Sequence, residues 1–282
     1  MRRKRNLFNW LMDTILILTV IFTLVPIYFL AITAFKSYAE AYSVPPTFFP
    51  QKFSLEGFQA LYKYVGDVPK IFANSLIISL MIIIPSIIFG TMAGYAFAAY
   101  KFKFKEVIFI ALLTKYLLPE IILIVPWYWI MIQLKLVNSL LGVAVVDLIG
   151  AWTIFFMRSY ISQIPLDYIE AARIDGASEN KILFGIIVPM IRPAWLVAIV
   201  INFIWSWSSL LWPLIILNTR DNYTLAIAVT FVRYLYGSGS ESPPHYPALA
   251  ATSLIYTLPA LVLYLAVQKW FIETFIKVGI KR

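Results

Sequence analysis

The sequence contains no cysteine and only one histidine. Disulfide scaffolds, thiol catalysis and cysteine-based metal sites are therefore excluded. The pattern G-x-x-x-x-G-K-[ST], which cradles nucleotide phosphates, is also missing, so the chain carries no P-loop for ATP. A membrane enzyme would need a convergent set of acids, bases, nucleophiles or metal ligands, and one histidine with scattered carboxylates does not supply it.

Charge is scarce as well. Charged residues make up 13% of the chain, whereas about 25% is usual in soluble domains. Hydrophobic residues make up 61%, and the mean hydropathy is +0.83. Several apolar runs reach the roughly 20 residues needed to cross a hydrocarbon core about 30 Å thick. The sequence therefore predicts an all-α membrane protein with six transmembrane helices, over residues 10–35, 71–99, 107–132, 140–161, 190–217 and 247–270.

The basic start, MRRKR, followed by an apolar run, also resembles a signal peptide. However, the run 10–35 is longer than a signal h-region, and no A-x-A cleavage site closes it. We therefore expect this segment to be retained as the first span.

The net charge of +9 is distributed by loop. With the N-terminus inside, the cytoplasmic pieces hold fifteen Lys and Arg, the outer pieces hold seven, and Lys115 falls within a span, which accounts for all 23. The positive-inside rule then predicts that both termini are cytoplasmic, and it explains the basic charge without a nucleic-acid partner. The expected organisation is a basic cytoplasmic N-terminus (1–9), the first span (10–35), an extracytoplasmic loop (36–70), a core domain with five spans (71–270) that includes a cytoplasmic loop (162–189) and an outer loop (218–246), and a cytoplasmic tail (271–282).

The cytoplasmic loop is unusual in so apolar a chain, because six charged side chains fall within the fifteen residues 167–181. Gly176 is placed to stop a first helix and turn the chain. Ser178 can cap a second helix, and Pro189 interrupts that helix before the fifth span. The loop is therefore predicted to form a helix–glycine–helix hairpin.

One side of the first helix is apolar, with Leu166, Ile169 and Ile174, and Ala171 leaves part of its surface thin. Most charged loops are simply solvated, so an ordinary surface hairpin is one interpretation. A short helix with an uncovered apolar side is marginal alone, which favours a protein partner.

At these residues the chain resembles the inner-membrane permease subunits of binding-protein-dependent ABC importers. Their shared EAA signature is present as Glu170, Ala171, Ala172, Asp175, Gly176, Ala177, Pro189 and Pro193. Similarity extends through NSLIIS at 74–79, YAFAAYKFKFK at 95–105 and FFMRSYISQIP at 155–165. In WSWSSLLWPLIIL at 205–217, Ser208 stands where the family pattern has Asn. The chain is most similar to the smaller permease of carbohydrate importers, which is related to the second membrane subunit of the maltose importer.

The resemblance implies a mechanism and a set of partners. In the family, the EAA helices are coupling helices that dock into a groove of a cytoplasmic ATPase, so Glu170 would pair with a basic residue there and Gly176 would set the turn. ATP and Mg would bind to two copies of that ATPase, and this chain would carry no cofactor. The other implied partners are a second homologous permease, an extracytoplasmic solute-binding protein and a sugar, in the inner membrane of a prokaryote.

Several other residues are candidates for the solute path or for structural roles. Lys115, Glu120 and Asp147 lie at membrane depth, where each charge costs about 2.5–3.5 kcal/mol. Glu120 either faces the solute or sits at the end of a helix kinked by Pro119 and pairs with Lys115. The predicted solute path comprises Glu120, Trp207 and Ser208. The tryptophans could stack on sugar rings or anchor helices at interfaces, namely Trp127, Trp129, Trp205, Trp207 and Trp212.

The outer loop contains Gly237, Ser238, Gly239 and Ser240, which could reach into an open binding protein or form a flexible connector. His245 is expected to be a plain loop residue. The predicted function is import of a sugar or oligosaccharide. Glycerol phosphate or another non-sugar solute is the alternative in the same class. A secondary transporter would show inverted repeats, which the sequence does not.

Overall fold

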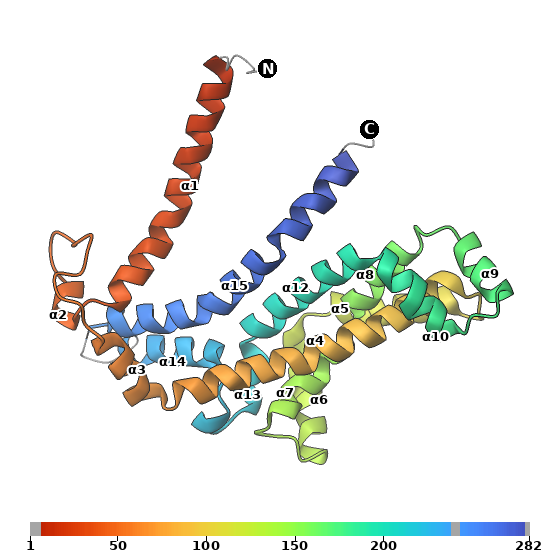
Figure 1. Cartoon of the computed structure of the whole chain (residues 1–282). Coiled ribbons are helices and arrows are strands. Elements are labelled where there is room, and N and C mark those ends of the chain that lie inside the picture. Colours follow the sequence, from red (N-terminus) through yellow and green to blue (C-terminus); the bar gives the residue numbers. More distant parts are fainter. Residues whose placement is uncertain (1–6, 238–242, 280–282) are drawn as a thin grey trace. The chain divides into compact units, whose positions relative to one another are not determined.

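The computed structural model describes residues 7–237 and 243–279, and every regular element in these ranges is a helix. The predicted all-α fold is therefore confirmed for this part of the chain. The chain divides into two compact units (Figure 1). Unit 1 comprises Met1–Val68 and Ala228–Leu258, and unit 2 comprises Pro69–Ile227 and Pro259–Arg282.

Three helices are each long and apolar enough to cross a membrane. They are α1 (Leu7–Ala34), α4 (Val68–Ala99) and α15 (Tyr246–Gly279). Only 6% of the apolar window of α1 is buried, whereas 44% of that of α4 is buried. An apolar helix that stays uncovered by protein needs lipid around it, so the surface of α1 is suited to a bilayer.

Three further candidate spans are bent helix pairs, and the third pair begins inside the predicted cytoplasmic loop 162–189. They are α5 (Lys105–Leu117) with α6 (Glu120–Gln133), bent by 100°; α7 (Leu140–Ala144) and η1 (Val145–Asp147) with α8 (Ala151–Ile161), bent by 41°; and α10 (Glu179–Ile182), η2 (Leu183–Ile187) and α11 (Val188–Met190) with α12 (Arg192–Ser208), bent by 83°. If each pair is one span, the described residues contain the predicted six.

Each of the predicted spans 107–132, 140–161 and 190–217 contains a break, and the kink at Pro119 was expected. Pro119 precedes α6, Gly150 precedes α8, and a proline lies at the first positions of α12. Proline and glycine suit the start of a helix and weaken its interior, so each break occurs where a new helix begins.

In unit 2, α4 and α8 approach each other closely at two glycines. A Cβ added at Gly90 would lie 2.7 Å from Cγ2 of Thr153, and one at Gly94 would lie 2.7 Å from Cβ of Met157. Small residues let apolar helices pack at short distance in a membrane. This contact therefore fixes α8, and the loop that follows it, against the second predicted span.

Toward the other end of α4, a buried apolar cluster joins α4, α6, α7 and α13 (Leu211–Ile216). Its members include Ile78, Ile82, Met131, Val143, Trp212 and Ile216. The indole N–H of Trp212 donates to the carbonyl of Gly142 at 3.2 Å, which satisfies the polar atom of this fully buried ring. The cluster gives this end of unit 2 a dry core.

Unit 1 contains two short helices of the predicted extracytoplasmic loop, α2 (Tyr38–Ala41) and α3 (Glu56–Val65). Lys36 is 4% exposed and its ammonium donates to the carbonyl of Thr47 at 2.6 Å, so its charge is held by the loop that follows.

The predicted connector 218–246 is more regular than its composition suggests. It contains η3 (Arg220–Asn222) and α14 (Leu225–Gly237), a helix of thirteen residues. Its glycine, serine and proline are concentrated at the C-terminal end, so the apolar part LAIAVTFVRYLY is free to form a helix.

Candidate functional site

The predicted hairpin is present between α8 and α12. Its first helix is α9 (Asp167–Ile174), and Gly176 turns the chain with φ +76°, in the left-handed region that favours glycine. Nothing lies within 4 Å of a Cβ built at Gly176, so the backbone alone requires this residue. The hydroxyl of Ser178 accepts from the backbone N–H of Lys181 at 3.4 Å, as expected for the cap of α10.

The apolar side predicted for the first helix is split. Ile169 is 2% exposed and Ala172 is also buried, so these residues hold α9 against its own chain. In contrast, Leu166 is 51% exposed and Ile174 is 86% exposed. The hairpin therefore satisfies part of its apolar surface internally and presents the rest outward.

Glu170 and Ala171 of the signature are exposed on the same helix. Among the residues that the structure describes, no hydrogen bond or ion pair reaches the carboxylate of Glu170. A charged side chain in this position is available to another polypeptide. Asp175 ends α9, and Ala177 lies between the turn and the cap of α10.

Glu179, which the sequence did not single out, is the polar centre of the hairpin. Its Oε1 accepts from Nε of Arg173 at 2.7 Å, and its Oε2 accepts from Nη2 of Arg173 at 3.4 Å. The hydroxyl of Tyr95 donates to Oε2 at 2.7 Å. The guanidinium of Arg173 also lies 5.1 Å from the centre of the Tyr100 ring. Because Tyr95 is in the last turns of α4, these bonds fasten both hairpin helices to the end of the second predicted span.

The electrostatic state of this cluster follows from the same contacts. The hydrogen bond from Arg173 lowers the pKa of Glu179 to about 2, with a further contribution from Tyr100. The carboxylate is therefore charged throughout the physiological range. The signal that could have identified Glu179 is an arginine and a glutamate placed on either side of the turn glycine.

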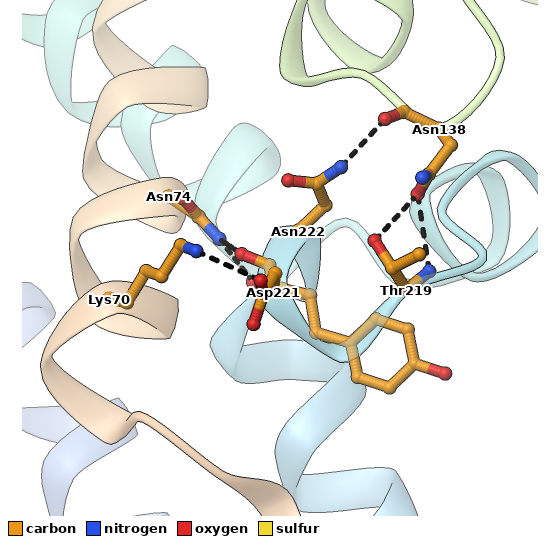
Figure 2. Close-up of polar contacts among 7 residues, drawn as sticks. Lys70, Asn74, Asn138, Thr219, Asp221 and Asn222 are labelled. Atoms are coloured by element: carbon orange, nitrogen blue, oxygen red, sulfur yellow. Dashed lines mark hydrogen bonds and ion pairs between the residues drawn. The ribbon is translucent and has the colours of Figure 1, made fainter.

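A second polar network lies at the other end of α4 (Figure 2). The amide of Asn74 donates to the carbonyls of Asp221 and Tyr223 at 2.8 and 3.1 Å. Lys70 pairs with Asp221 at 3.2 Å, and Oδ1 of Asn138 accepts from the backbone N–H and the hydroxyl of Thr219, each at 3.2 Å. These bonds join three segments of unit 2 that are distant in sequence.

The two networks are separated along one helix. Asn74 and Tyr95 are 21 residues apart on α4, which corresponds to about 32 Å at about 1.5 Å per residue. This is close to the roughly 30 Å thickness of a hydrocarbon core. The hairpin and the network of Figure 2 therefore lie at positions suited to opposite membrane surfaces.

Between these ends, unit 2 contains a cavity of about 540 Å³. Its charged lining residues are Lys115, Glu120 and Asp147. The predicted pairing of Lys115 with Glu120 is replaced by another: Nζ of Lys115 lies 3.6 Å from Oδ1 of Asp147 and donates to the carbonyl of Val146 at 2.7 Å. Lys115 also lies 5.6 Å from the ring centre of Trp127. Glu120 follows the break at Pro119, as one of the two interpretations expects.

Only some of the residues predicted for the solute path line this cavity. Glu120 and Ser208 line it. Trp207 does not: it is 4% exposed and stacks on Phe203 at 5.3 Å, so it is a packing residue. Trp129 is 62% exposed and also lies outside the lining. The sequence missed Trp152, Thr153 and Asn202, because their convergence depends on how α8 and α12 pack.

In the outer loop, Gly237 is the last residue of α14. Ser238, Gly239 and Ser240 lie outside the described residues. His245 is not a plain loop residue, since its Nδ1 accepts from the backbone N–H of Ala248 at 3.1 Å in the first turn of α15. Burial lowers the pKa of His245, which favours the neutral ring that this bond requires.

The family model described as "binding-protein-dependent transport system inner membrane component" matches residues 75–276. The chain is 30% identical over 284 residues to the arabinooligosaccharides transport system permease protein AraQ of Halalkalibacterium halodurans, covering 100% of both chains. It is 30% identical to the lactose transport system permease protein LacG of Rhizobium radiobacter, covering 73% of this chain and 74% of the relative. It is 26% identical to the sn-glycerol-3-phosphate transport system permease protein UgpE of Pectobacterium atrosepticum, covering 96% of both.

Among solved structures, the fold matches that of a bacterial ABC transporter involved in the import of the acidic polysaccharide alginate, with a TM-score of 0.79 and 20% sequence identity. The match covers 96% of this chain and 99% of the other. It supports the fold seen here, with its six apolar segments and the hairpin between the fourth and fifth. The chain belongs to the family of inner-membrane components of binding-protein-dependent transport systems, the permease subunits of ABC importers.

Proposed function

We propose that this chain forms half of the translocation path of an ATP-driven importer for a sugar or oligosaccharide, and that the hairpin 162–189 couples it to a separate ATPase. The observation that carries this proposal is the construction of the hairpin. It presents Glu170 and Ile174 to the outside while Tyr95 and Arg173 hold it through Glu179.

A joint between two proteins needs both properties. The outward face supplies a docking surface. If Glu170 forms an ion pair that is buried in the interface, removal of one partner would destabilise the complex by about 3–5 kcal/mol. The inward bonds make the hairpin move with α4, so a displacement imposed by the ATPase reaches the spans. The remaining partners are a second homologous permease, a second ATPase copy and an extracytoplasmic binding protein. ATP and Mg belong to the ATPase.

The orientation of the chain in the membrane is inferred from the distribution of its positive charges. Lys101, Lys103, Arg158 and Arg173 all lie in or next to the hairpin end of unit 2. Positively charged loops are retained in the cytoplasm, so the hairpin and both termini face inward. The network of Figure 2 then faces the binding protein.

The solute class is supported by the relatives. Two proteins at 30% identity are named as permeases for arabinooligosaccharides and lactose, which favours a neutral oligosaccharide. The 26% identical glycerol-phosphate permease keeps an anionic solute as the second candidate.

The experiment is affinity purification of the detergent-solubilised protein from its native cells, followed by mass spectrometry. Wild type should recover a P-loop ATPase, and Glu170→Lys should lose it. Asp221→Lys is the matched control, because it makes the same charge change at the other end of α4, where Asp221 is exposed.

If wild type recovers no ATPase, the coupling proposal fails. If both variants lose the ATPase, charge reversal acts through folding rather than through contact. Retention of the ATPase by Glu170→Lys would place the joint elsewhere.

A further inference from the structure

We propose that the cavity of unit 2 is a solute subsite for an uncharged sugar ring and that its charge disfavours anionic solutes. This inference rests on the proposed function, because it assigns the class of solute that crosses the membrane along this chain. It also assigns direct solute contact to this subunit.

The walls of the cavity are aromatic. Trp152 and Trp205 lie 5.0 Å apart with their rings at 76°, and Trp127 and Trp212 lie 5.7 Å apart at 72°. Both perpendicular pairs belong to the lining. Rigid ring faces offer large apolar area at little entropic cost, and the C–H face of a sugar ring is the complementary surface.

The floor of the cavity is polar and already organised. Thr153 and Asn202 line the cavity and are 1% and 6% exposed. The amide of Asn202 donates to the hydroxyl of Thr153 at 3.1 Å and to the carbonyl of Ala198 at 2.8 Å, while Ser86 bonds the Thr153 hydroxyl at 2.9 Å. These bonds use both amide hydrogens of Asn202, and its Oδ1 accepts from the hydroxyl of Ser86 at 3.1 Å. A connected network of this kind holds the polar side chains of the floor in one fixed arrangement.

The rim adds further hydroxyl groups, from Ser206, Ser208 and Ser209. The cavity volume of about 540 Å³ lies within the range of about 300–1,000 Å³ that is typical of small-molecule sites. Apolar walls with a few convergent polar groups are the usual composition of such sites.

The charge of the lining selects between the two candidate solutes. One lysine and two carboxylates line the cavity, which gives a net charge of −1. Lys115 is engaged by Asp147 and by the carbonyl of Val146, so its charge is compensated. Among the residues that the structure describes, no ion pair within 4 Å joins Glu120 to a cation, because Lys115 pairs with Asp147 instead. A phosphate or a uronate entering the cavity therefore meets a carboxylate, which is a repulsive element against the wrong solute.

The test is calorimetric titration of the full-length protein in lipid nanodiscs, together with any subunits that co-purify. The neutral probes are lactose and arabinotriose, and the anionic probes are sn-glycerol 3-phosphate and digalacturonate. We expect the better neutral probe to bind at least about tenfold more tightly than either anion. Glu120→Gln should reduce this preference, and Glu120→Lys should reverse it.

Asn202→Leu, which keeps the volume of the floor but breaks its hydrogen-bond network, should weaken binding of the neutral probe by about tenfold or more. Trp129→Phe is the matched control, because that ring is exposed outside the cavity and its loss should change nothing. Glu170→Lys should bind the probes as wild type does, which separates failure of this site from failure of the coupling proposal. Equal binding of neutral and anionic probes, or a preference that Glu120→Lys leaves unchanged, would overturn the assignment.

Discussion

The hairpin and the cavity are two polar sites of unit 2, and they are built in opposite ways. The hairpin leaves Glu170 and Ile174 exposed, and its bonded groups, Arg173 and Glu179, tie it to Tyr95 at the end of α4. The cavity turns its polar groups inward and surrounds them with tryptophan rings. A site that binds another protein must leave apolar and charged groups exposed for that partner. A site that binds a small solute must enclose the solute with side chains of its own chain.

Energetics differ between the two sites as well. The side chains of Arg173 and Glu179 are 36% and 45% exposed, so water screens their ion pair and its contribution is about 1 kcal/mol or less. The bond from Tyr95 comes from a side chain that is 4% exposed, and hydrogen bonds to charged groups contribute about 1.5–3 kcal/mol. The hydrogen bond from the buried Tyr95 therefore contributes most of the free energy that holds the hairpin to α4. The ion pair between Arg173 and Glu179 mainly orients the two side chains.

The largest effect is expected for Glu179→Lys. This change removes the bonds from Tyr95 and Arg173 and places a second cation beside Arg173. Hydrogen–deuterium exchange of the hairpin amides should become about a hundredfold faster, which corresponds to about 2.8 kcal/mol of local opening. Solute uptake should fall with it.

The same variant sharpens the comparison between the two sites. Binding of a neutral probe in the cavity should be unchanged in Glu179→Lys, because no cavity-lining residue contacts Glu179. Lost probe binding would show that the hairpin and the cavity are one cooperative unit, contrary to the separation argued here.

A smaller effect is expected for Tyr95→Phe, which removes one donor and keeps the packing of the ring. The loss of one bond to a partly exposed carboxylate should speed hairpin exchange by about tenfold. Tyr116→Phe is the matched control, because Tyr116 is 56% exposed and lies at the cavity. Unchanged exchange in Tyr95→Phe would mean that α4 does not hold the hairpin.

Arg173→Gln should have a still smaller effect, since the pair that it breaks is solvent-screened. Exchange of the hairpin amides should rise by about two- to fivefold, the range for an exposed pair of about 0.5–1 kcal/mol. The control is Arg158→Gln, which breaks a comparable pair with Glu106 at 2.7 Å outside the hairpin. A rise larger than that of Tyr95→Phe would invert the energetic order given above.

How much the sequence predicted also differs between the two sites. The hairpin depends on local rules: Gly176 takes a positive φ and Ser178 caps the next helix, and both follow from residue type and spacing. The cavity depends on tertiary packing. Trp152 and Asn202 belong to no recognisable motif, and the packing of α8 against α12, where Asn202 donates to Thr153, brings them to the same cavity.

The kink at Pro119 was expected, but the sequence did not show how strongly the spans are bent, for a related reason. Hydropathy averaged over about twenty residues detects an apolar run but does not detect a break within that run. Pro119 and Gly150 interrupt runs whose mean hydropathy is still that of a span. The partner of Lys115 was missed because a sequence-neighbouring carboxylate, Glu120, stood closer along the chain than Asp147 did.

The smallest effect is expected from pH, and it provides the strictest test of the hairpin. The hydrogen bond from Arg173 lowers the pKa of Glu179 from its ordinary value of 4.5 to about 2. A carboxyl whose pKa is lower in the folded state stabilises the fold fully above its unfolded pKa, and that stability is lost as the pH falls through the folded value. Protection of the hairpin amides, corrected for the intrinsic exchange rate, should therefore be constant from about pH 8 to pH 5.5. In Arg173→Gln the pKa of Glu179 loses its main depressing contact and moves back toward the ordinary range, so the loss of protection below about pH 5 should be smaller than in wild type. A fall in wild-type protection between pH 8 and 5.5 would mean that another group fastens the hairpin, and the contrast between a charge-directed joint and a charge-selective cavity would no longer hold.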